Sequence, residues 1–152
     1  MDVLEGFRGA ARRALSAAPE EMERWHQGWI GPEHLLMALL RDGSSVAGTM
    51  LAQLGATEEL RRLLESILGE MGPRIRPPAT PFPSVKQVIV AAPEAARRAG
   101  AAATGTGHLL IGLLAASDSD IARILQGAGV GQTTVRAMLP HVVALGEEAG
   151  GG

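Results

Sequence analysis

Two histidines are the residues of this chain best placed for chemistry. His34 follows Glu33 in the run Gly-Pro-Glu-His-Leu-Leu, and His108 lies 74 residues further along. Because carboxylate and imidazole groups bind zinc, a small metal-dependent hydrolase using Glu33, His34 and His108 is one hypothesis. The alternative gives each histidine a local hydrogen bond in the first turn of a buried helix. We favour the alternative, since acidic residues are lacking near His108, and we predict no metal site.

Other forms of catalysis have little support in the sequence. Ser44 and Ser45 follow Gly43 at an expected helix start, where capping accounts for both hydroxyls. There is no cysteine, no nucleophile-elbow signature and no phosphate-binding Gly-x-x-x-x-Gly-Lys pattern around Lys86, the single lysine. We therefore predict that the chain is not an enzyme and needs no cofactor.

Two further groups of residues allow either a binding or a structural role. Trp25 and Trp29 are interpreted as packing in the turn before a second helix, with an exposed anchor for a partner as the alternative. Charged residues just before them are predicted to form a solvated face: Glu20, Glu21, Glu23 and Arg24.

Composition favours a helical protein that binds neither nucleic acid nor membranes. Apolar residues make up 46% of the chain and aromatic residues only 3%, as in tightly packed helices without strand-forming residues. The net charge is −2, and no basic stripe suited to nucleic acid or anionic lipid is visible. The apolar stretches are too short to cross a bilayer, and the start of the chain does not resemble a signal peptide. We expect a cytoplasmic protein that is monomeric in isolation.

The elements that position the two histidines occur twice in the sequence. Residues 11–55 match the residues 74 positions later at 14 of 45 places, and these include Pro19 with Pro93 and His34 with His108. Between the copies lies a segment with five prolines, 71–83, which cannot be helix or central strand. The predicted units are repeat 1 (1–70), a Pro-rich linker (71–83), repeat 2 (84–146) and a flexible Gly-rich tail (147–152).

Each copy is predicted to contain four helices, because apolar residues recur at helical spacing between turn signals. Pro19 and Pro93 predict a kink or a break in the two first helices. Pro32 is expected at the first position of one second helix, and Thr106 as the N-cap of the other. Gly55 and Gly129 should end the third helices. The expected ranges are 3–27, 32–40, 44–54 and 57–70, followed by 84–101, 106–114, 118–128 and 132–145. The predicted fold is all-α: two tandem four-helix repeats related by a pseudo-twofold axis.

The residues at matching places resemble a known family. Phe7, Ala11 and Arg12, followed by the run from Ile30 to Leu40, resemble the Clp repeat, and a weaker copy follows the linker. Two such repeats form the amino-terminal domain of ClpA- and ClpC-type AAA+ unfoldases, and the resemblance covers about residues 5–145. The motif positions are Gly31, His34, Leu35, Leu36, Gly105, His108, Leu109 and Leu110.

The resemblance implies a non-catalytic module that recruits protein substrates or adaptors to a Clp-type unfoldase, or regulates it. It assigns partner binding to Phe7, Arg12, Glu33 and Phe82, the last of which lies one residue off register. ClpC-like members also recognise phosphorylated arginine through the Glu before each His. Glu33 matches that residue, whereas Gly107 replaces the second Glu and Pro32 replaces a usual Thr, so phosphoarginine is a doubtful ligand here.

Two alternatives to recruitment are kept. The first is a stand-alone regulator, or a sensor that binds a ligand in the groove between the repeats. The second, more remote, is the metal-dependent hydrolase. The sequence has no AAA+ motif, which fits both a free-standing protein and a fragment of a longer unfoldase.

Overall fold

The computed structural model describes residues 5–27, 30–71, 83–115 and 120–144. Within these ranges it contains eight helices and no strand, which confirms the all-α prediction. Their bounds are α1 Gly9–Arg24, α2 Pro32–Arg41, α3 Val46–Gln53, α4 Thr57–Met71, α5 Pro83–Arg98, α6 Thr106–Ala115, α7 Asp120–Gly127 and α8 Gln132–Ala144. None of these helices is both long and apolar enough to cross a membrane.

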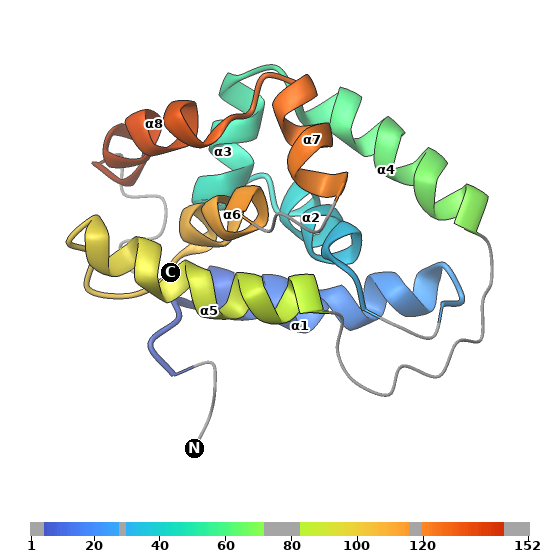
Figure 1. Ribbon diagram of the computed structural model, residues 1–152, viewed down its shortest axis with the longest axis horizontal. Helices are drawn as coiled ribbons and strands as arrows, with labels where there is room; N and C mark the ends of the chain where they lie inside the picture. The colour runs from blue at the N-terminus through green and yellow to red at the C-terminus, as the bar shows by residue number, and fades with distance from the viewer. Residues whose placement is uncertain (1–4, 28–29, 72–82, 116–119, 145–152) are drawn as a thin grey trace.

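The helices form two sets of four around an approximate twofold axis, as predicted. The first and fifth helices run in opposite directions along one side of the molecule, while α2 and α6 lie in the middle (Figure 1). Each first helix packs on the second helix of its own repeat, α1 on α2 and α5 on α6. Contacts between the repeats join α3 to α6 and α8, and α6 to α1 and α2. The two repeats therefore share one core.

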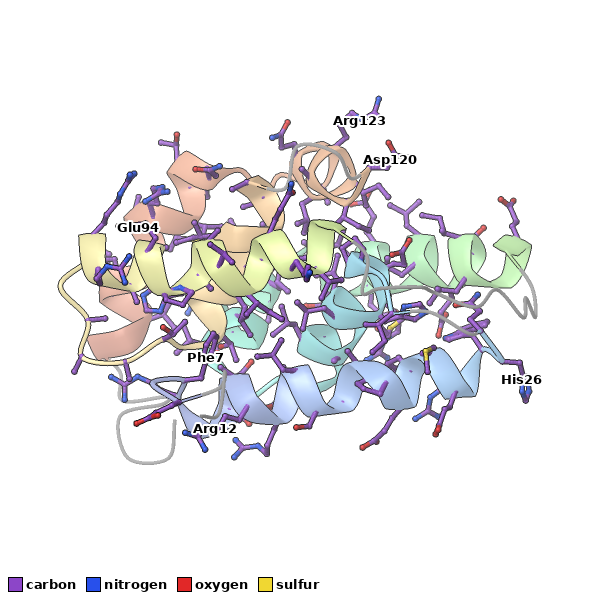
Figure 2. The ribbon with its side chains drawn as sticks, turned by 60° about the horizontal axis from the view of Figure 1, so that its bottom comes forward. Phe7, Arg12, His26, Glu94, Asp120 and Arg123 are labelled. Atoms are coloured by element: carbon purple, nitrogen blue, oxygen red, sulfur yellow. The ribbon has the colours of Figure 1, made fainter. Side chains whose placement is uncertain are left out.

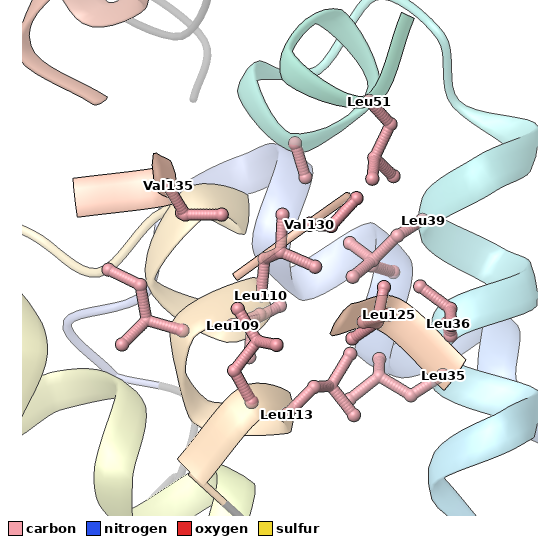
Figure 3. Close-up of a cluster of buried hydrophobic side chains, with 14 of the residues drawn as sticks. Leu35, Leu36, Leu39, Leu51, Leu109, Leu110, Leu113, Leu125, Val130 and Val135 are labelled. Atoms are coloured by element: carbon pink, nitrogen blue, oxygen red, sulfur yellow. The ribbon is translucent and has the colours of Figure 1, made fainter. Parts of the chain in front are cut away.

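The two central helices supply much of that core, because they are apolar on nearly every face. Leu36 of α2 and Leu109 and Leu110 of α6 have no exposed surface, and Figure 3 shows them in one cluster with side chains from α3 and α7. Burying a leucine side chain contributes about 2 kcal/mol relative to leaving it in water. The leucines at matching positions of the two repeats thus belong to one core cluster.

Four helices end in the same way, and the two repeats match in this respect. After α3 and α7 the chain turns at Gly55 and Gly129, which have φ of +69° and +88° and end these helices as predicted. Two hydrogen bonds close each turn; after α3, Ala56 N–H donates to the carbonyl of Leu51 and Gly55 N–H to that of Ala52. The turns after α1 and α5 use the same pattern, centred on His26 and Gly100.

Two predictions about the first helices are wrong. The first helix begins at Gly9 rather than residue 3, because Gly6 turns the chain at φ +90° and Phe7 pairs with Thr104 of the second repeat. Of the kink or break predicted at Pro19 and Pro93, the break is wrong, because α1 and α5 continue through these prolines, while the kink stays a prediction. Packing of the apolar face of each helix outweighs the cost of an internal proline, about 3 kcal/mol.

The predicted linker and tail fall mainly outside the described residues. Residue 71 ends α4 and residue 83 begins α5, so the two ends of the predicted linker are helical. Phe82 and the tail from 147 to 152 lie outside the described ranges. The division at these points stays a prediction.

Candidate partner-binding site

The two histidines occupy the same place in their repeats. The Gly31 N–H donates to Nδ1 of His34 at 2.8 Å, and the Gly105 N–H donates to Nδ1 of His108 at 2.9 Å. Both glycines precede the helix, so each imidazole satisfies a backbone N–H that the helix leaves unpaired. The local hydrogen bond predicted for these histidines is confirmed.

In the first repeat the second ring nitrogen is also bound. Because Nδ1 of His34 accepts a hydrogen bond, the proton of the neutral ring lies on Nε2, 2.6 Å from Oε1 of Gln27. The amide of Gln27 in turn donates to the Leu68 carbonyl at 3.3 Å. Burial lowers the pKa of His34 to about 4, although the charge of Glu21 opposes this shift. His34 is therefore a neutral residue that ties α2 to α4.

These bonds argue against the hydrolase hypothesis. A metal ligand needs a free nitrogen lone pair, and the Nδ1 lone pairs of His34 and His108 both accept backbone N–H groups. The remaining nitrogen of His34 points at Gln27. The described part of the chain contains no group of three or more histidine, aspartate or glutamate side chains arranged to hold a metal. We do not carry this hypothesis further.

Glu33 lies where the first turn of α2 faces the start of α7. Its carboxylate folds back over Gly31, close enough that any side chain at Gly31 would collide with it. Burial raises the pKa of the Glu33 carboxyl, its own backbone N–H opposes the rise, and the negative charge of Asp120 adds to it. The junction of α2 and α7, which we call the acidic junction (Glu33 and Asp120), thus favours a cationic group.

The corresponding junction, formed by α6 of the second repeat and α3 of the first, has a different chemistry. Gly107 in the first turn of α6 faces the start of α3, and a Cβ there would collide with a methyl of Leu139. It would also lie 3.3 Å from Cε of Met50 and 3.3 Å from a methyl of Val46. We call Gly107, Val46, Met50 and Leu139 the apolar junction. A side chain at position 107 would have to displace the Leu139 methyl, and the carboxylate of the first repeat has no counterpart here.

Thr106 has a different role from the predicted N-cap of its own helix. It lies inside α6 as the first residue, and its hydroxyl accepts the N–H of Ala47 at 2.9 Å. Ala47 is in the first turn of α3, whose own N-cap is Ser45, the acceptor for the N–H of Gly48 at 3.0 Å. Thr106 therefore satisfies a helix end of the opposite repeat, which sequence reasoning within one repeat could not reveal.

Two of the predicted partner-binding residues lie at the start of α1, and the structure separates their roles. Phe7 is only 6% exposed and belongs to the core, so its ring is not available to a partner. Arg12 is exposed, and its Nε donates to the Phe7 carbonyl at 3.1 Å (Figure 2). Arg12 and Glu33 are thus the exposed and half-buried members of the predicted set, while Phe82 lies outside the described residues.

One ion pair between a buried glutamate and a partly exposed arginine was missed by the sequence reasoning. Glu21, predicted to lie on a solvated face, is only 2% exposed and binds the guanidinium of Arg41 through both carboxylate oxygens. Arg24 lies 3.6 Å from the same carboxylate. The pair joins α1 to α2. The predicted packing role of Trp25 is confirmed, since it contacts the core, while Trp29 lies outside the described residues.

A pair of Clp repeats is the class that this fold and these matching junctions define. The family model described as Clp repeat (R) N-terminal domain matches residues 7–128 and 80–151. The chain belongs to this family, as its motifs predicted. The protein named "Negative regulator of genetic competence ClpC/MecB" of Bacillus subtilis (strain 168) is 31% identical over 142 residues. That alignment covers 93% of this chain and 17% of the relative, so the chain spans about a sixth of the relative's length.

Solved structures share the fold at low sequence identity. The N-domain of ClpV from Vibrio cholerae has a TM-score of 0.74 at 14% identity, covering 93% of this chain and 87% of that one. The ClpV N-domain in complex with a VipB peptide has a TM-score of 0.73 at 16% identity, covering 97% and 91%. These likenesses show that the eight-helix arrangement is that of Clp N-domains.

Proposed function

We propose that this chain is a non-catalytic module that binds protein segments and brings substrates or adaptors to a Clp-type AAA+ unfoldase. The observation that carries the proposal is the tandem Clp repeat, which occupies almost the whole chain and has two histidines in structural, hydrogen-bonded positions. The VipB peptide bound to the ClpV N-domain supports a peptide-binding role for this fold. The cytoplasmic location and the monomeric state stay predictions.

The acidic junction is the proposed contact for cationic side chains of a partner. Glu33 is half-buried beside Asp120, so a guanidinium or ammonium group placed there would gain from both carboxylates. The apolar junction gives no such contact, because Gly107 has no side chain and the nearest side chains, those of Val46, Met50 and Leu139, are apolar. If phosphorylated arginine binds at all, we expect one site per chain.

A degradation assay tests the proposal. The purified chain is added in excess to a Clp-type ATPase, its peptidase and a fluorescent unfolded protein. A recruiting module supplied free in solution competes for substrate or adaptor, so degradation slows while hydrolysis of short peptides is unchanged. Glu33→Gln should weaken the competition, whereas Glu58→Gln, at an exposed glutamate on α4, should not.

The same assay separates recruitment from direct regulation. A stand-alone regulator would change the ATPase rate in the absence of substrate, which a competitor for substrate would leave unchanged. An unaltered degradation rate at saturating chain, together with no capture of unfoldase, adaptor or substrate by the immobilised chain, would contradict both forms of the proposal.

A further inference from the structure

A pocket of about 540 Å³ opens in the second repeat. It lies between the end of α5, the start of α6 and α8, and the first repeat adds Arg8 and Val46 to its wall. Its volume falls within the range of roughly 300–1,000 Å³ that is usual for ligand sites. The pocket is therefore large enough for a small ligand or the end of a peptide.

The pocket exists because small residues replace large ones at matching positions. Four lining residues of the second repeat have larger counterparts 74 positions earlier: Ala95, Ala99, Ala101 and Gly107 replace Glu21, Trp25, Gln27 and Glu33. In the first repeat these side chains are packed, with Glu21 and Gln27 buried and Trp25 against the core. The same backbone arrangement is thus filled in one repeat and hollow in the other.

The lining of the pocket combines aliphatic and cationic groups. Its inner wall includes Val46, Ile111 and Leu139, all buried. The aromatic ring among its described lining residues is the imidazole of His108, which is buried and accepts the Gly105 N–H. Three arginines line it, and the lining residues in the described part of the chain include no aspartate or glutamate. Such a lining favours a ligand that is aliphatic and anionic.

Two of the arginines, Arg98 and Arg136, have positive charge that no carboxylate of the described residues fully neutralises. Arg136 donates to the amide oxygen of Gln132 at 3.3 Å, which is a neutral partner. Arg98 lies 3.8 Å from Glu94, but that carboxylate is 2.7 Å from Arg97 and is shared between the two. Each planar guanidinium can form two parallel hydrogen bonds to a carboxylate.

We infer that this pocket binds the free carboxyl terminus of a peptide whose last residues carry aliphatic side chains. Arg136 and Leu139 are three residues apart on α8 and so lie on one face, about 5–6 Å between their Cβ atoms. A terminal residue presents its carboxylate and its side chain at a comparable separation. The inference rests on the proposed peptide-binding function but assigns a site separate from Glu33.

The test measures fluorescence anisotropy with a labelled pentapeptide, Gly-Ser-Ala-Leu-Leu, made as the free acid and as the carboxyl-terminal amide. The acid is expected to bind at least about tenfold more tightly than the amide, and its binding should weaken as ionic strength rises. Arg136→Gln should weaken acid binding about fivefold or more. Ala99→Trp, which restores the residue of the first repeat, should abolish it. Arg123→Gln, at an exposed arginine of α7 outside the pocket, should leave binding unchanged.

Circular dichroism and thermal unfolding of each variant show that the fold is retained before binding is compared. Equal affinity for acid and amide, or unchanged binding by folded Arg136→Gln and Ala99→Trp, would overturn the inference. So would the absence of binding at about 1 mM peptide, or displacement of the acid by inorganic phosphate as readily as by unlabelled peptide. Because no unfoldase is present, failure here leaves the degradation assay, which depends on Glu33, as a separate test of the proposed function.

Discussion

The two junctions between the repeats have the same geometry and opposite chemistry. At one, the first turn of α2 faces the start of α7 with Glu33 beside Asp120. At the other, the first turn of α6 faces the start of α3, and Gly107 packs against Val46. Glu33 and Gly107 are 74 positions apart, and so are Val46 and Asp120. The duplicated backbone has therefore been kept while the chemistry of the side chains has diverged. The fold thus supplies two equivalent positions, and single side chains decide what each can bind.

The interiors of the repeats differ in a related way. In the first repeat, Glu21 pairs with Arg41, and His34 bonds through Gln27 to the end of α4. The second repeat has alanine at the positions of Glu21, Gln27 and Arg41, namely 95, 101 and 115. A polar network therefore holds the first repeat together, whereas the second has small side chains and a pocket. The first repeat should be the one that is sensitive to loss of charge or hydrogen bonds.

The largest effect is expected from breaking the ion pair of the buried Glu21 with Arg41. Arg41→Ala leaves the carboxylate of Glu21 buried without its main partner, which should lower the free energy of unfolding by about 3–5 kcal/mol. The double variant Glu21→Ala, Arg41→Ala copies the second repeat and should recover part of that loss. Urea unfolding of the two single variants and the double variant measures the coupling. Additive losses would show that the pair does not act as a unit.

The next effect concerns pH. Because the pKa of His34 is about 4 in the folded protein and 6.5 in the unfolded chain, only the unfolded chain takes up a proton between these values. Stability should therefore fall as pH is lowered from 6.5 to about 4 and level off below, a loss of about 3 kcal/mol from this residue.

His34→Asn is the control for the pH prediction. Its side-chain oxygen can still accept the Gly31 N–H, but it does not titrate. The difference in unfolding free energy between wild type and His34→Asn, followed against pH, should slope only inside the window from 6.5 to 4. A difference that is flat across this window would contradict the buried, neutral histidine.

A smaller effect distinguishes the two junctions directly. Gly107→Ala places a Cβ against Leu139 and should destabilise the protein by about 1–3 kcal/mol, because a packed junction must open. Glu33→Ala removes a half-buried carboxylate whose pKa is raised, so it should change stability by less than about 1 kcal/mol. Thermal unfolding of both variants makes the comparison. Equal losses would show that the acidic junction is packed as tightly as the apolar one.

The sequence predicted the fold well because its signals are local and duplicated. Gly55 and Gly129 marked helix ends, Pro32 marked a helix start, and the matching of His34 with His108 placed both histidines correctly. These features depend on the few residues around them, so they can be recognised without knowing how the helices pack.

The features that the sequence did not predict involve residues far apart in the chain. Glu21 and Arg41 are separated by 20 positions, and Thr106 reaches Ala47 across 59 positions. The same holds for the burial of Phe7, which depends on its pairing with Thr104. A signal for the pocket was nevertheless present, since the alignment of the repeats showed small residues in place of Trp25 and Gln27. Its interpretation required knowing that these positions line one space.

The smallest expected effect tests the turns after α1 and α5, where the first repeat has His26 and the second has Gly100. His26 follows α1 at φ +57° and is the only residue other than glycine with positive φ in the described ranges, while its counterpart Gly100 follows α5 at +73°. A side chain in this conformation costs roughly 1 kcal/mol, so His26→Gly should stabilise the protein by up to about that amount, and Gly100→Ala should destabilise it by a similar amount. His26 is exposed (Figure 2), and a Cβ at Gly100 would meet no atom within 4 Å, so packing contributes little to either change. If urea unfolding shows that the free energy of unfolding rises in both variants or falls in both, the two turns are not equivalent. The repeats would then have diverged in the backbone as well as in the side chains.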